Sequence, residues 1–223
     1  MKTMILGLLA VLLATAGALA AESLTFTVVG IDCEACAPPI LKALNAVPGV
    51  KTATLDWKAG TATVDVADGF DRQRLRTALE DIGYEAVFSG EERKDLQPLP
   101  EEIRKTLDIA SASEGRKIDL DEVLVPGKAT VLDYWATWCS PCHLLDIRLE
   151  RLVQANPKLA VRRVDVGRWD NAAAKQATSL FRVEALPYVR VYDARGKFVG
   201  AETGGAWDKI LKLVEKALAR SGA

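Results

Sequence analysis

The chain has 223 residues, enough for one large domain or two small ones, and its charged and apolar contents are those of an ordinary globular protein. Its formal net charge is −1, so there is no basic excess to neutralise nucleic-acid phosphates or to bind an anionic membrane surface. We therefore expect no nucleic-acid partner.

The first twenty residues are typical of a secretory signal peptide. Lys2 supplies a positive charge, and an apolar run over 4–13 is followed by an alanine-rich stretch. Residues 18–20 (Ala-Leu-Ala) fit the small-x-small rule of signal peptidase, so we expect cleavage after Ala20. The alternative is an uncleaved membrane anchor, because the low-charge run approaches the length that spans a bilayer. The expected location is outside the cytoplasm, in a bacterial periplasm, with membrane anchoring if the signal is not cleaved.

Residues 22–89 are predicted to form one α+β domain. Alternating β-prone residues and apolar residues at helical spacing place strands at 23–29, 51–57, 61–66 and 84–88, and helices at 37–46 and 71–82. The Lys-Ala-Gly segment at 58–60 indicates a hairpin, and Gly83 is typical of a helix C-terminus. The order strand, helix, strand, strand, helix, strand is the ferredoxin-like pattern.

Residues 90–115 are charged and contain prolines, which favours a linker. One short helix is expected in it, over 101–109. The charge run at 91–95 is expected to be solvated.

Residues 116–223 are predicted to form a second domain in which strands and helices alternate. The strands are expected at 117–120, 130–136, 161–166, 187–193 and 197–201, and the helices at 139–155, 171–181 and 207–219, with a helical turn at 121–125. This alternation predicts an α/β sandwich around a mixed sheet.

The four cysteines form two Cys-x-x-Cys pairs more than a hundred residues apart, which indicates two separate sites. Cys139 and Cys142 follow a buried strand and open a predicted helix. The partial positive charge of a helix N-terminus lowers the pKa of a thiol placed there. Cys139 is therefore the predicted attacking thiolate, and Cys142 is the residue that resolves the mixed disulfide.

The same run continues into His143 and spells Cys-x-x-Cys-His, the signature of c-type haem attachment. However, Met1 and Met4 are the only methionines and lie in the predicted signal, and His143 is the only histidine. The mature chain would then lack the usual distal haem ligands. A four-ligand zinc site would have to borrow Cys33 and Cys36. Redox chemistry is the favoured interpretation, and no organic cofactor is expected.

Two runs, Asp-Tyr-Trp-Ala-Thr-Trp-Cys-Ser-Pro-Cys at 133–142 and Ala-Leu-Pro-Tyr at 185–188, resemble thioredoxin. The resemblance covers residues 117–220 and implies a thioredoxin fold that acts on protein thiols or disulfides. It leaves open whether the protein reduces or oxidises them. Ser140 replaces the usual glycine, which leaves the reduction potential open as well.

Three further site residues follow from the thioredoxin resemblance. Asp133 is implied to be a buried acid that assists proton transfer at the resolving cysteine. Pro187 is implied to be a cis-proline beside the dithiol, where it shapes the surface that receives substrate. Trp138 is implied to pack next to the attacking sulfur. His143 stands where lysine is usual, and we interpret it as a partly exposed surface residue.

The run Gly-Ile-Asp-Cys-Glu-Ala-Cys at 30–36, with Leu-Glu-Asp-Ile-Gly-Tyr-Glu-Ala at 79–86, resembles the heavy-metal-associated domain of copper chaperones and metal-exporting ATPases. It implies that Cys33 and Cys36 bind a soft ion, and two thiolates on a loop suit Cu(I), which we favour. By resemblance, an acid directly before the first cysteine, here Asp32, is a feature of zinc, cadmium and lead exporters. Asp32 is therefore a candidate third ligand for Zn(II) or another soft divalent ion. Alternatively, the pair forms a disulfide that binds no metal or exchanges electrons with the second pair.

The leading hypothesis is an exported thiol–disulfide oxidoreductase coupled to a soft-metal-binding domain. It would reduce metal-site cysteines, its own or those of a partner. A membrane electron donor and a metal transporter or metalloprotein are the further partner classes implied. The alternative is a metallochaperone in which the thioredoxin-like domain only docks.

Overall fold

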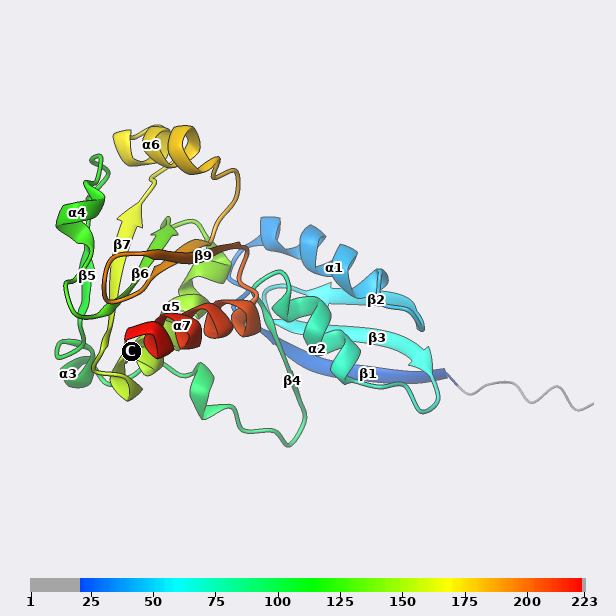
Figure 1. The fold of residues 1–223 in the computed structure, drawn as a ribbon. Helices are drawn as coiled ribbons and strands as arrows, with labels where there is room; N and C mark the ends of the chain where they lie inside the picture. Colours follow the sequence, from blue (N-terminus) through cyan, green and yellow to red (C-terminus); the bar gives the residue numbers. More distant parts are fainter. Residues whose placement is uncertain (1–20, 222–223) are drawn as a thin grey trace, which may run out of the picture.

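The computed structural model describes residues 21–221, which form two α/β units in contact (Figure 1). The expected signal peptide at 1–20 lies outside the described residues. Within residues 21–221, no helix is both long and apolar enough to cross a membrane.

The N-terminal domain is an antiparallel sheet with strand order β2-β3-β1-β4, covered by two helices (Figure 1). This is the predicted ferredoxin-like arrangement, and the fold prediction is confirmed. Its elements are β1 (Ala21–Val29), η1 (Glu34–Cys36), α1 (Ala37–Asn45), β2 (Val50–Asp56), β3 (Thr61–Ala67), α2 (Gln73–Glu80) and β4 (Glu85–Phe88).

The core of this domain follows from the alternation of β1 and the spacing of the helices. Leu24, Phe26 and Val28 are buried at every second position of β1, so they share one face of the sheet. Ile40 and Leu44 of α1 lie four residues apart and pack into the same cluster. The helices therefore cover one face, and the loop between β1 and α1 is held at the end of the sheet.

The C-terminal domain is a five-stranded mixed sheet of order β5-β7-β6-β8-β9, with β5, β6 and β7 parallel and β8 and β9 antiparallel to their neighbours. The predicted α/β sandwich is confirmed. Its elements are β5 (Ile109–Ser111), α4 (Leu120–Val123), β6 (Ala129–Trp135), α5 (Ser140–Ala155), β7 (Leu159–Asp165), α6 (Ala172–Phe181), β8 (Tyr188–Tyr192), β9 (Phe198–Thr203) and α7 (Trp207–Ser221).

Two packed clusters fill the two faces of the second sheet. One cluster joins apolar residues of α5 and α7 to Val131 on β6. The other joins α6 to Leu132, the next residue of the same strand. Because successive strand residues point to opposite faces, β6 is buried on both sides, as its apolar run predicts. Cys139 therefore follows a rigid central strand.

The start of this domain differs from the prediction in three ways. No strand forms at 117–120; instead Asp119 caps α4, and its side chain accepts a hydrogen bond from the Asp121 amide at 3.0 Å. The first strand of the sheet is β5, which lies inside the segment expected to be the linker and pairs with β7. The short helix α3 (Glu101–Arg104) ends earlier than expected, since the chain turns into β5.

The segment between the domains packs against α5. The turn η2 (Lys94–Leu96) contacts this helix, and Leu96 and Leu99 are buried. Arg93 was expected in a solvated charge run, but its guanidinium lies 3.1 Å from the carboxylate of the fully buried Glu85. The solvated interpretation is wrong for Arg93, because a buried carboxylate requires a counter-charge.

Candidate active site and metal-binding loop

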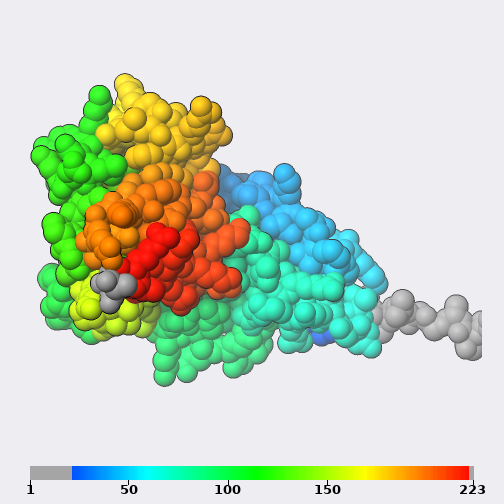
Figure 2. All heavy atoms as spheres, in the orientation of Figure 1, coloured from blue at the N-terminus to red at the C-terminus, as the bar shows by residue number. Residues whose placement is uncertain are grey.

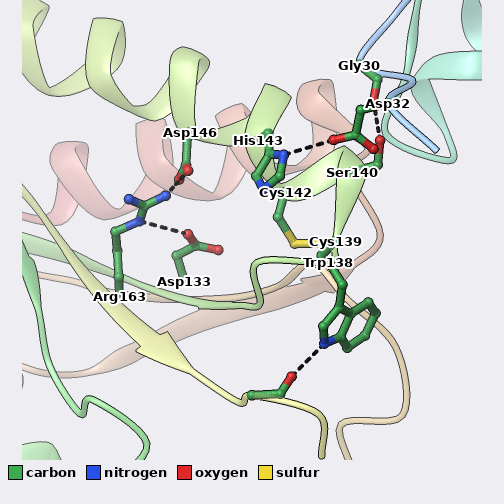
Figure 3. The surroundings of a disulfide bond; sticks show 11 residues. Gly30, Asp32, Asp133, Trp138, Cys139, Ser140, Cys142, His143, Asp146 and Arg163 are labelled. Carbon is green, nitrogen blue, oxygen red and sulfur yellow. Dashed lines mark hydrogen bonds and ion pairs between the residues drawn. A yellow bond between two sulfur atoms is a disulfide. The ribbon is translucent and has the colours of Figure 1, made fainter. Parts of the chain in front are cut away.

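Cys139 and Cys142 form a disulfide at the N-terminal end of α5 (Figure 3). Cys139 is the N-cap of this 16-residue helix, and its carbonyl accepts a hydrogen bond from the Cys142 amide at 3.0 Å. Pro141 occupies the first turn, where its missing N–H costs no intrahelical bond. After reduction, the sulfur of Cys139 is placed where the helix dipole stabilises a thiolate.

Asp133 lies on β6 and is fully buried (Figure 3). Neither of its carboxyl oxygens makes a hydrogen bond to the described residues, and Arg163 Nε lies 3.8 Å from Oδ2, too far for one. Burial raises the pKa of Asp133 to about 6, although the charge of Arg163 opposes the rise. A carboxyl with this pKa can accept and return a proton near neutral pH. This is the chemistry that its predicted role requires.

Pro187 and Trp138 lie in two loops at the same end of the sheet. The Leu186–Pro187 peptide is cis, and the Pro187 carbonyl accepts a hydrogen bond from the Gly204 amide at 2.8 Å. The Trp138 indole is 48% exposed, and its N–H donates to the Gly167 carbonyl at 2.6 Å (Figure 3). The exposed ring leaves an apolar surface directly before Cys139.

Cys33 and Cys36 form the second disulfide, in the loop between β1 and α1. The donor atoms of Asp32, Cys33 and Cys36 lie within 4.8 Å of one another, and Cys36 Sγ is 4.0 Å from Asp32 Oδ1. Asp32 is exposed, Cys33 is half-buried and Cys36 is buried. Once reduced, two thiolates and one carboxylate are a donor set that fits a soft or borderline cation. While they form the disulfide, the two sulfurs are not free to bind one.

The two cysteine loops meet across the domain interface (Figure 3). The Ser140 hydroxyl donates a hydrogen bond to the Gly30 carbonyl. His143 Nδ1 lies 3.2 Å from Asp32 Oδ2. At 45% exposure His143 lies on the surface, as expected, but it is also a contact residue between the domains. No local pattern reveals this contact, because the paired residues are 111 positions apart.

Glycine backbones form the centre of this interface. A Cβ added to Gly205 would overlap the Cα of Gly83, and a Cβ added to Gly83 would lie 2.7 Å from the Cβ of Pro141. Gly205 directly follows Gly204, whose amide donates a hydrogen bond to the Pro187 carbonyl. The N-terminal domain thus covers the surface beside the cis-proline and the dithiol, and Cys139 is only 3% exposed. Figure 2 shows the two domains as one continuous surface around α7.

A buried ion pair crosses the same interface. Glu85 of β4 is fully buried, and its carboxylate binds the Arg148 guanidinium of α5 in a close pair. Arg148 also lies over the Trp207 ring, 5.4 Å from its centroid. Burial and the neighbouring charge of Glu85 raise the pKa of Glu80. Glu85 therefore has two counter-charges, Arg93 from the connecting segment and Arg148 from the second domain.

Comparisons with known proteins divide the chain in the same way. The family model of the heavy-metal-associated domain matches residues 25–85, and the thioredoxin model matches residues 116–216. A thioredoxin of Echinococcus granulosus is 32% identical over 94 residues, which are 41% of this chain and 83% of that protein. A probable copper-importing P-type ATPase A of Enterococcus hirae is 37% identical over 78 residues, 35% of this chain and 10% of the ATPase.

Solved structures are similar to each half. Oxidized MerP from Ralstonia metallidurans CH34 is 30% identical, with 31% of this chain and 99% of that chain covered and a TM-score of 0.30. The short form of thioredoxin f from spinach chloroplast is 20% identical, with 50% and 94% covered and a TM-score of 0.42. The chain belongs to the thioredoxin family, and it carries a heavy-metal-associated domain in front of its thioredoxin domain.

Proposed function

We propose that this chain is an exported thiol–disulfide oxidoreductase that reduces its own metal-site cysteines. In this proposal the Cys139/Cys142 dithiol reduces the Cys33–Cys36 disulfide, and the freed thiols then bind a soft metal as cargo. The observation that carries the proposal is the contact between the two cysteine loops. Ser140 follows the attacking cysteine and binds Gly30, three residues before Cys33.

The transfer balances as a two-electron exchange of disulfides. The Cys139 thiolate attacks one sulfur of the Cys33–Cys36 disulfide, forming a mixed disulfide and releasing the other sulfur as a thiolate that takes up a proton. Asp133 accepts the Cys142 proton, and the Cys142 thiolate attacks Cys139 Sγ, which breaks the mixed disulfide and releases the second metal-site sulfur as a thiolate that takes up a proton. The products are a reduced metal-site pair and an oxidised Cys139–Cys142 disulfide. An external dithiol donor, expected at the membrane, restores the active-site pair.

Two features support an intramolecular substrate. The surface beside Pro187 is covered by the chain's own N-terminal domain through Gly83 and Gly205, so a foreign substrate would have to displace it. In an exported protein, the oxidising surroundings would convert Cys33 and Cys36 into a disulfide that binds no metal. A tethered reductase restores the pair without a second encounter between proteins.

The test follows the reduction of the metal-site disulfide by mass spectrometry after alkylation of free thiols. The fully oxidised chain is treated with about 0.1 mM dithiothreitol, which is below the mM effective concentration of a tethered thiol. The natural sequence should reduce Cys33–Cys36 faster than a Cys139→Ser/Cys142→Ser variant, in which dithiothreitol must attack that disulfide directly. Equal rates would contradict the proposal and favour a metallochaperone whose second domain only docks, a role that the buried Glu85–Arg148 pair also fits.

A further inference from the structure

We infer that His143 of the thioredoxin domain is a ligand of the metal held by Asp32, Cys33 and Cys36, so that the metal site spans both domains. The inference rests on the proposed function only in requiring the reduced cysteine pair. It assigns a fourth donor that lies outside the N-terminal domain, and it changes the class of ion that the site prefers.

The positions of the donor atoms carry this inference. His143 Nδ1 lies 3.2 Å from Asp32 Oδ2, and Cys36 Sγ lies 4.0 Å from the other oxygen of the same carboxylate. With ordinary Zn–N and Zn–O bond lengths, two ligands of a tetrahedral ion are about 3.3 Å apart, and a sulfur and an oxygen are about 3.6 Å apart. Reduction lets the two sulfurs separate to the spacing that an ion needs. His143 is not among the donors that lie within 4.8 Å of one another, so its imidazole must turn toward the cysteine pair for a single ion to contact all four donors.

The fold holds His143 toward the loop independently of any metal. His143 is in the first turns of α5, a 16-residue helix. Two other residues of this helix contact the N-terminal domain: Ser140 binds Gly30, and Arg148 binds Glu85. The imidazole and the carboxylate are each about half exposed, at 45% and 50%, so the position is open to an incoming ion. The interface therefore presents the donor without a large rearrangement.

The donor set distinguishes between metals. Cu(I) is satisfied by two thiolates, and a carboxylate adds little to its binding. Two thiolates, one imidazole and one carboxylate complete the four-coordinate site that Zn(II) takes in proteins. The docked chain thus favours Zn(II) or a related soft divalent ion, whereas the separated N-terminal domain would offer Cu(I) its two thiolates alone.

The test uses the full chain with Cys139→Ser/Cys142→Ser, chemically reduced, so that the second dithiol neither binds metal nor transfers electrons. Failure of the proposed redox function would leave this measurement unaffected. His143 is the only histidine, so ¹⁵N-histidine labelling reports on it alone. On binding of ¹¹³Cd(II), the Nδ1 resonance should be split by coupling to the metal. An Nδ1 resonance without this splitting would overturn the assignment.

A matched set of variants gives the second readout. His143→Asn keeps a donor to Asp32 at the place of Nδ1 but removes the imidazole. It should weaken Zn(II) binding at least about tenfold, since even outer-shell partners of a metal are worth about 10–100-fold, and leave Cu(I) binding unchanged. Lys209→Ala removes an interdomain contact of 3.9 Å to Asp81 and should change neither affinity. Unchanged Zn(II) binding in His143→Asn, or an equal loss for Cu(I), would overturn the inference.

Discussion

Replacement of Asp133 by asparagine should stabilise the oxidised chain at neutral pH. The side chain is fully buried, and burial raises its pKa from an ordinary 3.8 to about 6. In the unfolded chain the carboxyl ionises near 3.8, whereas in the folded chain it ionises only near 6. The folded state therefore loses stability as pH rises from about 4 to about 6, and the asparagine variant does not.

The size of the effect follows from the interval between the two pKa values. At about 1.4 kcal/mol for each pKa unit, the interval from 3.8 to about 6 amounts to about 3 kcal/mol. Below pH 4 the natural chain and Asp133→Asn should be nearly equal in stability. At pH 7.5 the variant should be more stable by about 3 kcal/mol.

Urea unfolding followed by tryptophan fluorescence measures this difference, because four of the five tryptophans follow residue 115. Asp68→Asn removes an exposed carboxylate from the loop after β3 and serves as the control for the loss of one charge. A stability difference that does not change between pH 4 and pH 7.5 would refute the reasoning, as would a variant that loses stability with rising pH. The same variant should slow resolution by Cys142, since its proton acceptor is gone.

Two further predictions concern the domain interface. Gly205→Ala should separate the domains, because the added Cβ would overlap Gly83; small-angle scattering should show a larger radius of gyration, and reduction of Cys33–Cys36 should slow. Arg148→Met should lower the free energy of unfolding in urea by less than the roughly 3 kcal/mol of an uncompensated buried charge, because Arg93 stays 3.1 Å from Glu85, and the double variant Arg148→Met/Glu85→Leu should recover most of the loss.

Gly205 has no positive φ, so alanine is acceptable to its backbone, and only the contact with Gly83 is tested. A variant with unchanged scattering would show that the backbones are not in contact in solution. For the ion pair, a double variant as unstable as Arg148→Met alone would show that the loss comes from packing on Trp207 and not from removal of the Arg148 charge beside Glu85.

Local sequence patterns predict most of this fold. The alternation of Leu24, Phe26 and Val28 identifies β1, and the long apolar run before Cys139 identifies the doubly buried β6. β5 could not be predicted in this way, because its three residues are too few to show a period. The segment expected to be a linker is held by Leu96 and Leu99, two isolated apolar residues whose burial is not visible in a composition that is mostly charged.

The candidate site likewise combines features that the local sequence predicts with contacts that it does not. Both cysteine pairs and Asp133 are short-range signals, since a dithiol and a lone acid in an apolar strand are visible within ten residues. The contacts of Ser140 with Gly30 and of Arg148 with Glu85 join positions 110 and 63 residues apart, so spacing carries no information about them. One signal was present: Glu85 lies in an otherwise apolar strand, and a buried carboxylate requires a partner.

The most direct test of the central claim is to trap the transfer intermediate. In a Cys142→Ser chain with Cys139 reduced and Cys33–Cys36 oxidised, Cys139 can attack but Cys142 can no longer resolve the mixed disulfide, and alkylation of the released metal-site thiol blocks the reverse attack. Mass spectrometry of digested monomer should find Cys139 linked to Cys33 or Cys36 of the same chain, in a yield that does not depend on protein concentration. A mixed disulfide found only in dimers, or a yield that falls on dilution, would contradict an intramolecular reductase.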